Sequence, residues 1–190
     1  MKVLNIHERE LPESAARVGA LIDSLSSRED ALWPKHCWPR MELDRPLSVG
    51  AAGGHGPIRY CVEAYAPGRA VQFRFTEPIG FDGHHRYEVI SSDEKTWALR
   101  HTLEMHTRGL AVAAWLWVFR PMHDALIEDS LAAAEVSLGH APKLQPSSAW
   151  VRTLRWVVSR GRARAQVSPD STAHRAESAS EENVLSKARR

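Results

Sequence analysis

The sequence lacks the features that mark secreted, disulfide-rich and membrane-spanning proteins. It contains two cysteines, Cys37 and Cys61, with no CxxC motif and too few thiols for a disulfide framework. Its longest apolar run, Leu110–Phe119, has ten residues, about half of what a membrane-spanning helix needs. Lys2 and Glu8 place charges in the region where a signal peptide has its apolar core. We therefore expect a cytoplasmic protein with reduced cysteines.

Two common catalytic motifs are also missing. The segment Gly50–Gly56 is rich in glycine but lacks the Gly-Lys-Ser/Thr ending of a phosphate-binding loop. No serine or cysteine lies in the Gly-x-Ser-x-Gly pattern of a hydrolase nucleophile. The sequence therefore predicts neither nucleotide binding nor nucleophilic hydrolysis, and we interpret the glycines as a turn between two strands.

The charge is small overall but unevenly distributed. The net charge is +2. Residues 1–140 hold 15 basic and 19 acidic residues, a net charge of −4, whereas residues 141–190 hold 10 basic and 4 acidic residues, a net charge of +6. Nucleic-acid-binding domains normally carry a concentrated positive charge on the folded part of the chain. We therefore expect no nucleic-acid partner.

The composition is that of a folded globular chain, with 43% hydrophobic and 25% charged residues. A length of 190 residues predicts one domain with an appendage. Alternation of apolar and polar side chains predicts a first strand over residues 2–9. After Pro12, apolar residues at helical spacing predict a helix that ends near Leu25, and a second short helix is predicted over Arg28–Leu32.

From residue 45 onward the hydrophobic period changes from 3.6 to 2, which indicates strands separated by turns. Glycine, proline and serine clusters mark the turns. The predicted strands cover residues 47–51, 58–64, 71–76, 85–89 and 97–106.

The apolar run Leu110–Phe119 is compatible with a strand or a helix. Pro121 favours the strand, because a proline inside a helix costs about 3 kcal/mol but is tolerated at the first helical position. We therefore predict a seventh strand there and a long helix from Pro121 to Leu138, ending before Gly139. This helix is predicted to be amphipathic. Its apolar stripe is Ile127, Leu131, Ala134 and Leu138, and its water-facing residues are Asp124, Glu128 and Glu135.

These elements together predict an α+β protein. A curved seven-stranded antiparallel sheet would wrap around the long C-terminal helix, with two short helices after the first strand. The opening KVLNIHERELPESAARVGALIDSL and the closing WLWVFRPMHDALIEDSLAAAE resemble the START-like, or SRPBCC, superfamily, including its polyketide cyclase/dehydrase-like members. The resemblance covers residues 1–139.

The resemblance implies a helix-grip fold with a deep hydrophobic pocket under the last helix. Members of this superfamily bind lipids, sterols, polyketides, hormones or other apolar molecules, and only some of them catalyse a reaction. The superfamily has no universal catalytic motif, so the resemblance assigns no catalytic residue.

The predicted domain boundaries follow from the distribution of charge and from the pattern of hydrophobic and polar residues along the chain. Residues 1–139 are predicted to form the ligand-binding helix-grip domain, 140–166 a basic amphipathic extension and 167–190 a disordered polar tail. Tryptophan and aliphatic side chains are interspersed with arginines over residues 150–164, a composition that suits a membrane surface or an acidic partner. A helix packed back on its own acidic domain is the alternative. The oligomeric state is left open.

The apolar parity of each strand predicts which side chains face the pocket. Such a surface, mostly aromatic and aliphatic, suits a flat or apolar ligand, and simple filling of the core is the alternative. The orientation of Trp115 and Trp117 stays open, because both faces of their predicted strand are apolar. The full predicted lining is Tyr60, Phe73, Phe75, Tyr87, Trp97, Leu99, Leu103, Trp115, Trp117, Ile127 and Leu131.

Three histidines are predicted to join this apolar face. His85 and His101 have the parity of the apolar residues on their strands, and His123 lies on the apolar stripe of the long helix. Converging with Tyr60 or Tyr87, they could supply acid–base chemistry, so Tyr87, His101 and His123 are the catalytic candidates. Hydrogen-bonded structural histidines are the alternative.

Local histidine pairs do not have the spacing of a metal site. His101 and His106 are five residues apart on a predicted strand and point to opposite faces, as do the adjacent His84 and His85. We therefore expect neither a metal ion nor a cofactor.

The sequence favours binding or carriage of a hydrophobic small molecule or lipid in an internal pocket. The alternative is a polyketide cyclase or aromatase type of enzyme that uses pocket histidine and tyrosine side chains as acid and base. Whether the protein catalyses a reaction is left open, with a non-catalytic binding protein favoured.

Overall fold

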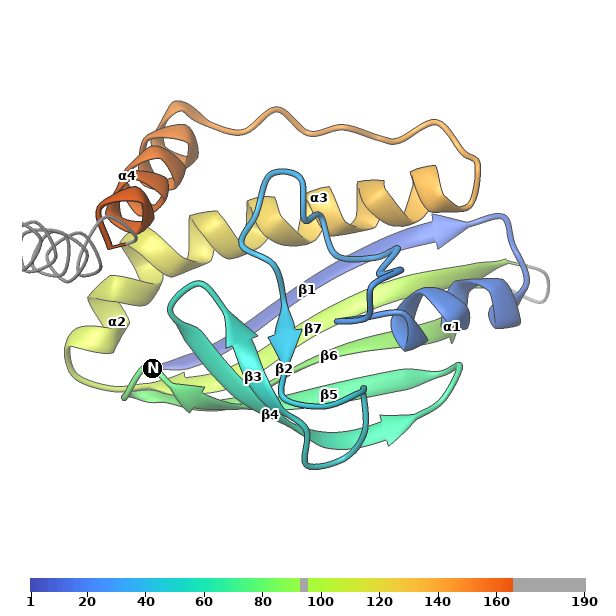
Figure 1. Ribbon diagram of the computed structural model, residues 1–190, viewed down its shortest axis with the longest axis horizontal. Coiled ribbons are helices and arrows are strands. Elements are labelled where there is room, and N and C mark those ends of the chain that lie inside the picture. The colour runs from blue at the N-terminus through green and yellow to red at the C-terminus, as the bar shows by residue number, and fades with distance from the viewer. Residues whose placement is uncertain (93–95, 166–190) are drawn as a thin grey trace, which may run out of the picture. The chain divides into compact units, whose positions relative to one another are not determined.

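A seven-stranded antiparallel sheet forms the centre of the first part of the chain in the computed structural model (Figure 1). The structure describes residues 1–92 and 96–165, with side chains up to Val157. The chain divides into two units, Met1–Ser147 and Ser148–Arg190. The second unit contains helix α4 (Ala149–Ala165), and the predicted disordered tail from residue 167 lies outside the described residues.

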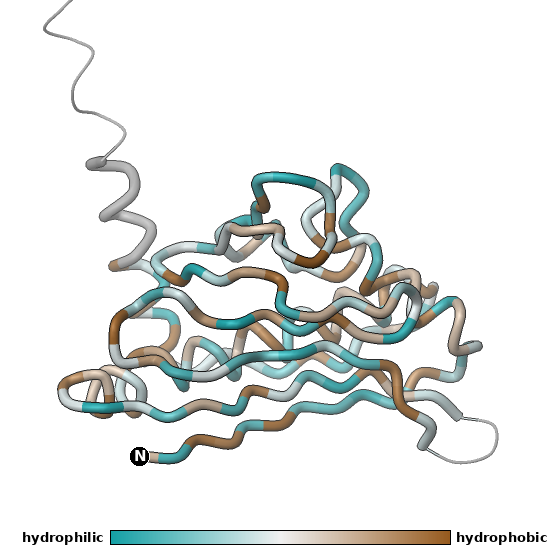
Figure 2. The backbone as a smooth tube through the Cα atoms, turned by 90° about the horizontal axis from the view of Figure 1, so that it is seen from below, coloured by the Kyte–Doolittle hydropathy of each residue, from teal (hydrophilic) through white to brown (hydrophobic). Residues whose placement is uncertain are grey.

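The strand order is β1-β7-β6-β5-β4-β3-β2. Strands β2 to β7 pair in sequence, and β1 pairs with β7, so the first strand lies beside the last. Hydrophobic and hydrophilic residues alternate along these strands (Figure 2), as expected for a sheet with one buried face. The bounds are β1 Lys2–Leu11, β2 Glu42–Leu43, β3 Ala52–His55, β4 Ile58–Ala66, β5 Ala70–Glu77, β6 Phe81–Ser91 and β7 Trp97–Thr107.

The predicted α+β architecture of a curved seven-stranded sheet and a long helix is confirmed. The predicted strand over residues 47–51 is wrong, and β3 lies further along the chain. Gly53 and Gly54 belong to β3 rather than to a turn. A Cβ atom at Gly53 would collide with the Glu42 carbonyl, and one at Gly54 with the Ile58 carbonyl. Close approach of neighbouring backbones therefore explains these two glycines.

Helix α1 (Ala15–Asp23) follows β1 as predicted and is capped by the Ser14 side chain. The predicted second helix over Arg28–Leu32 is wrong. There the Asp30 carboxylate accepts the N–H groups of Leu32 and Trp33, at 3.0 and 2.8 Å. A side chain thus satisfies the backbone donors that a helix would pair with its own carbonyls, and the segment remains irregular.

The predicted seventh strand over Leu110–Phe119 is wrong, because this run is helical. Helix α2 (Leu110–Ala114), a π-helical turn η1 (Trp115–Phe119) and helix α3 (Arg120–Ser137) are continuous along the chain. In the π-helical turn, the Arg120 N–H donates to the Trp115 carbonyl, five residues earlier. A proline in a regular helix clashes with the carbonyl four residues before it. The wider turn relieves this clash, so Pro121 is accommodated inside a long helix.

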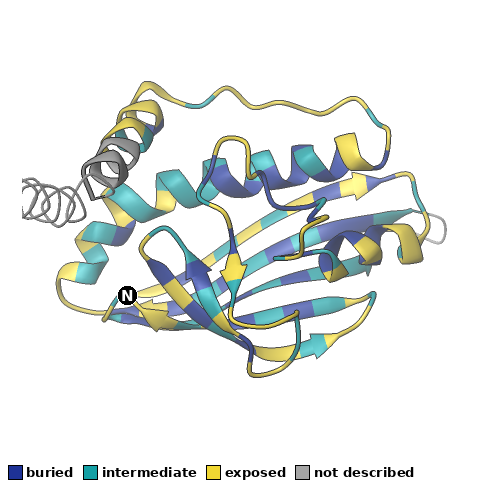
Figure 3. Ribbon diagram, in the orientation of Figure 1, coloured by how far each residue is buried: buried dark blue, intermediate teal, exposed yellow. Residues whose placement is uncertain are grey.

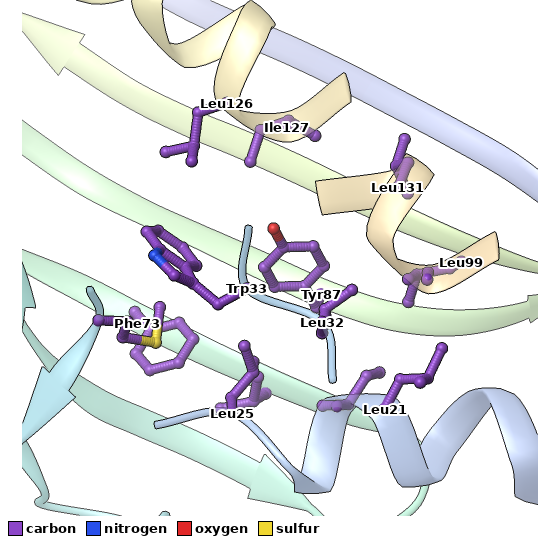
Figure 4. Close-up of a cluster of buried hydrophobic side chains, with 14 of the residues drawn as sticks. Leu21, Leu25, Leu32, Trp33, Phe73, Tyr87, Leu99, Leu126, Ile127 and Leu131 are labelled. Atoms are coloured by element: carbon purple, nitrogen blue, oxygen red, sulfur yellow. The ribbon is translucent and has the colours of Figure 1, made fainter. Parts of the chain in front are cut away.

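Helix α3 covers the inner face of the sheet, and Figure 3 shows its buried side facing the strands. In Figure 4, Leu126, Ile127 and Leu131 project from α3 towards the sheet residues Phe73 and Tyr87. By length and composition alone, the continuous helix from residue 110 to residue 137 could cross a membrane. In this fold the buried residues of this helix lie in its later turns, whereas only 17% of its most apolar stretch is buried.

A polar contact lies beside this apolar core, between β1 and α3. Arg9 is buried, with 8% of its surface exposed. It donates to Glu135 over 2.7 Å and to Glu128 over 2.9 Å. The prediction that Asp124, Glu128 and Glu135 face water is therefore wrong: Glu135 is buried, and the other two are half-buried against β1. The orientation of α3 on the sheet therefore depends on its carboxylates as well as on its apolar stripe.

We expect Arg9→Met to lower the free energy of unfolding by about 3–5 kcal/mol, because it leaves Glu135 buried without its cation. Adding Glu135→Leu should recover most of this loss, since it removes the most buried carboxylate, while Glu128 keeps its hydrogen bond to His7. The control is Arg100→Met, which breaks the exposed ion pair with Glu8 and should cost less than about 1 kcal/mol. Urea unfolding measures all three. Equal losses for Arg9→Met and Arg100→Met would contradict the prediction.

Candidate functional site

Imidazole and phenol rings form a row from the sheet to helix α3. Strand register explains part of the row: His7 pairs with His101 across β1 and β7, and His101 pairs with Tyr87 across β7 and β6. Consecutive ring centroids are 5.7, 5.0, 5.4, 5.1 and 6.0 Å apart. In order, the members are His55, Tyr60, His85, His101, His123 and His7.

His85 lies in an aromatic environment. Its ring stacks on Phe73 and Phe75, with centroids 4.9 and 5.1 Å away and interplanar angles of 19° and 27°. Tyr60 contacts it edge-on at 5.0 Å. Aromatic side chains therefore cover the imidazole, and only 5% of its surface is exposed.

His85 and His101 form a hydrogen bond whose consequences do not depend on the tautomer. His85 Nδ1 lies 3.3 Å from His101 Nε2, so one of the two nitrogens donates and the other accepts. The remaining nitrogens, His85 Nε2 and His101 Nδ1, are buried and have no hydrogen-bond partner. A neutral imidazole has one N–H and one lone pair. In either tautomeric arrangement, the pair therefore presents one unpaired donor and one unpaired acceptor.

Two tyrosine hydroxyls near the row are engaged differently. The Tyr60 hydroxyl lies 3.1 Å from His55 Nδ1. The Tyr87 hydroxyl lies 2.9 Å from Ser130 Oγ, and Ser130 in turn donates to the Leu32 carbonyl over 3.1 Å. Because Ser130 uses its own proton there, Tyr87 donates to Ser130. The geometry therefore favours Tyr60 over Tyr87 as the phenol available to the histidine row.

Burial keeps the central histidines neutral. It lowers the pKa of His85 and of His101 well below the ordinary value of 6.5, and the neighbouring imidazoles lower both pKa values further. Burial also lowers the pKa of His55 to about 3. The pKa of the Tyr60 hydroxyl is raised well above its ordinary value by burial and by Tyr87. Near neutral pH these groups are uncharged hydrogen-bonding groups.

The β1 end of the row has the opposite electrostatics. His7 Nδ1 lies 2.8 Å from Glu128 Oε1, and His7 Nε2 lies 3.3 Å from Asp124 Oδ1. Burial acts to lower the pKa of His7, but the hydrogen bonds to Asp124 and Glu128 outweigh it and raise the pKa. For His123, burial outweighs Asp124 and lowers the pKa. The row therefore runs from an aromatic interior to a carboxylate-rich end.

The structure places most of the predicted lining residues on the inner face. Phe75 and Trp97 are half-buried. Trp115 is buried, with its ring 6.1 Å from Phe81 and 5.9 Å from His123. Trp117 is 70% exposed, so its placement in the lining is wrong, because the segment is a helix and not a strand. The buried members are Tyr60, Phe73, Tyr87, Leu99, Leu103, Ile127 and Leu131.

His7, His55 and the carboxylates of α3 were not predicted as site residues. The sequence pattern could have placed His7 on the inner face, because His7 shares the parity of the buried Val3 and Leu11 in β1. Leu4 and Ile6, on the other parity, suggested the opposite face, but they are exposed. His55 had no signal, because its strand was interpreted as a turn.

Helix α4 forms within the predicted basic extension, and its Trp150 and Trp156 are about half exposed. Contact of this segment with a membrane surface or an acidic partner stays a prediction.

Comparisons with known proteins support the fold. No family model and no curated protein sequence matches the chain. A solution structure from Thermobifida fusca covers 75% of this chain and 99% of its own, with 16% identity and a TM-score of 0.56. A norcoclaurine synthase mutant from Thalictrum flavum covers 73% and 96%, with 14% identity and a TM-score of 0.56. The protein XoxI from Bacillus cereus covers 72% and 98%, with 16% identity and a TM-score of 0.51.

These identities are too low to show more than the architecture. This chain shares the helix-grip fold of the norcoclaurine synthase. These structures therefore support the predicted fold, a curved antiparallel sheet with a long C-terminal helix.

We expect His85→Phe to change how stability depends on pH. Below pH 6.5 the unfolded chain binds a proton at His85 that the folded protein does not, because burial lowers the folded pKa. Wild-type stability should therefore fall by up to about 1.4 kcal/mol per pH unit from this group as the pH decreases. The variant lacks this loss, and phenylalanine suits the aromatic surroundings.

The measurement is urea unfolding of both proteins between pH 7.5 and pH 4.5. At pH 7.5 the wild type should be more stable by about 1 kcal/mol, since it keeps the hydrogen bond to His101. This advantage should shrink as the pH falls. His106→Gln, at an exposed position of β7, is the control and should follow the wild type. A constant difference between His85→Phe and wild type would contradict the assignment.

Proposed function

We propose that the protein binds a small, flat, mostly apolar molecule that carries a hydroxyl or carbonyl oxygen, between the sheet and helix α3. The observation that carries the proposal is the unpaired donor and acceptor of the His85–His101 pair. A buried polar group without a partner costs about 1–3 kcal/mol. A ligand oxygen would remove this cost, whereas a purely apolar ligand would not.

The surroundings of the pair favour an aromatic ligand. Phe73 and Phe75 stack on His85, and Tyr60 contacts its edge. Binding sites of this kind are mostly apolar, with a few polar groups that orient the ligand. Neutral imidazoles suit such a ligand, because an ionised histidine would instead select an anion.

One structural neighbour guides the choice of probe. A structure of norcoclaurine synthase that covers 75% of this chain, with 15% identity and a TM-score of 0.50, contains dopamine and hydroxybenzaldehyde. Hydroxybenzaldehyde is flat and aromatic and carries oxygens that both donate and accept hydrogen bonds. It is therefore a suitable first probe for the proposed ligand class.

We expect 4-hydroxybenzaldehyde to bind the full chain saturably and more tightly than toluene, which has a ring but no oxygen. His101→Phe should weaken hydroxybenzaldehyde binding by about tenfold, since one hydrogen bond contributes roughly 1–1.5 kcal/mol. It should leave toluene binding nearly unchanged. Ligand-observed NMR titration measures both affinities.

His106→Gln is again the matched control, because it removes an exposed imidazole from the same strand. It should bind both probes as the wild type does. If neither aromatic probe binds saturably, or if His101→Phe weakens both probes equally, the proposal is wrong.

The alternative function is acid–base catalysis of the cyclase type, and one observation favours it. The buried His85–His101 pair has one unpaired imidazole lone pair, which is the group that a general base uses to accept a proton. The elementary step would remove a proton from the carbon next to a ketone carbonyl. The proton would move to the free imidazole nitrogen, leaving an enolate.

This step can be tested without knowing the substrate. In D₂O, the protein should accelerate deuterium exchange at the α-carbon of 2-tetralone over buffer, and His101→Phe should lose about 10²-fold or more of that acceleration. Proton NMR follows the exchange. A wild-type rate equal to buffer, together with saturable binding of hydroxybenzaldehyde, would leave a binding protein without this chemistry.

A further inference from the structure

The carboxylate-rich end of the row contains a group of metal-ligand type. His7 from β1, with His123 and Asp124 from α3, each offer one ligand atom, and these atoms all lie within 4.8 Å of one another. Spacing along the chain reveals only ligands that are close in sequence, and His7 lies more than 110 residues before His123 and Asp124. The sheet register and the packing of α3 on β1 bring these distant residues together.

The distances around Asp124 match those of a four-coordinate ion. Asp124 Oδ1 lies 3.3 Å from His7 Nε2 and 3.6 Å from His123 Nδ1. In a tetrahedral zinc site with bonds of about 2.0–2.1 Å, neighbouring ligand atoms are separated by roughly 3.3–3.4 Å. Both distances exceed those of good charge-assisted hydrogen bonds, about 2.7–2.9 Å. Two of the three separations are therefore close to those of ligands on one ion, and the His7 and His123 nitrogens lie within 4.8 Å of each other.

Glu128 orients His7 as an outer partner of a metal ligand would. His7 Nδ1 lies 2.8 Å from Glu128 Oε1 and donates its proton there, and Arg9 holds the other oxygen of Glu128 over 2.9 Å. In neutral His7, the Nε2 lone pair then faces Asp124 Oδ1. Two electron-rich atoms at this distance require a proton or a cation between them. The carboxylate–histidine arrangement is common behind zinc ligands.

Unpartnered polar atoms surround the same point. Both ring nitrogens of His123 are buried without a hydrogen-bond partner, and so is Asn5 Oδ1. Asn5 instead uses its Nδ2 to donate to Asp124 over 2.9 Å. A bound ion would give His123 the partner that the protein does not supply.

The charges also favour a cation. Three carboxylates, Asp124, Glu128 and Glu135, lie along this side of α3. Arg9 is buried between two of them, and Arg120 approaches Asp124 only at 3.9 Å, with more than half of its side chain exposed. With neutral histidines, the group keeps an excess of negative charge, whereas a proton on His7, which contacts both Asp124 and Glu128, offsets part of it and competes with a metal ion.

We propose that His7, His123 and Asp124 bind one divalent metal ion of the zinc class, with a fourth position open to water or a small oxygen donor. Two imidazole nitrogens and one carboxylate suit zinc, whereas magnesium and calcium prefer oxygen ligands. The fourth position distinguishes such a site from a closed structural site. The proposal does not rest on the His85–His101 pair.

The experiment titrates the metal-free full chain with ZnCl₂ in a calorimeter. The wild type should bind one zinc ion at this site, and His7→Gln and Asp124→Asn should each weaken that binding by at least about 10²-fold. Glu128→Gln keeps all three ligands and should weaken binding by about 10–100-fold, as loss of an orienting partner does. His106→Gln, at an exposed position, should bind zinc as the wild type does.

Two further measurements on the wild type keep the test decisive if a variant fails to fold. Cobalt(II) bound at this site should give the intense visible absorption of four-coordinate cobalt. Zinc should also change the imidazole ¹⁵N chemical shifts of His7 and His123 in NMR spectra, and should change those of His85 less.

Unchanged zinc affinity in folded His7→Gln and Asp124→Asn, or zinc-induced shifts confined to other histidines, would overturn the proposal. No zinc binding at micromolar concentration would do the same. Loss of hydroxybenzaldehyde binding with normal zinc binding would instead contradict only the proposed function.

Discussion

The structure depends on the contact between helix α3 and the inner face of the sheet. This one helix must bury two kinds of surface at once. Leu126, Ile127 and Leu131 pack over the aromatic side of the sheet, while Glu128 and Glu135 pair with Arg9 from β1. Apolar burial is non-directional, whereas buried charges need specific partners. The ion pairs therefore fix the position of the helix across the sheet in a way that the apolar contact alone would not.

This arrangement gives the histidine row its two ends. The aromatic end holds neutral imidazoles, because burial disfavours their charged form. At the other end, Asp124 and Glu128 raise the pKa of His7. A single row thus offers unpaired hydrogen-bonding groups for a neutral molecule and a negatively charged set of ligands for a cation. The two ends differ because aromatic side chains of the sheet surround one and carboxylates of α3 surround the other. The histidines themselves are the same at both ends.

Much of the fold was predictable from hydrophobic periodicity. The parity rule placed His85 and His101 on the buried face, and their convergence with His123 and a tyrosine is observed. Periodicity failed where another interaction prevailed. Asp30 prevented a helix by accepting backbone N–H groups, and the π-helical turn accommodated Pro121, which had indicated a strand. Trp117 was misplaced as a direct result of that second error.

The sequence by itself determined the inner face of strands β4 to β7, the existence of the gripping helix and the residue types that reach the interior, because side-chain alternation is a local property of the backbone. Only the tertiary structure decided which polar groups meet. His7 and Asp124 are distant in the chain, and their approach depends on β1 pairing with β7 and on α3 crossing beside β1. The functions proposed for this protein rest on such non-local contacts, which local periodicity does not encode.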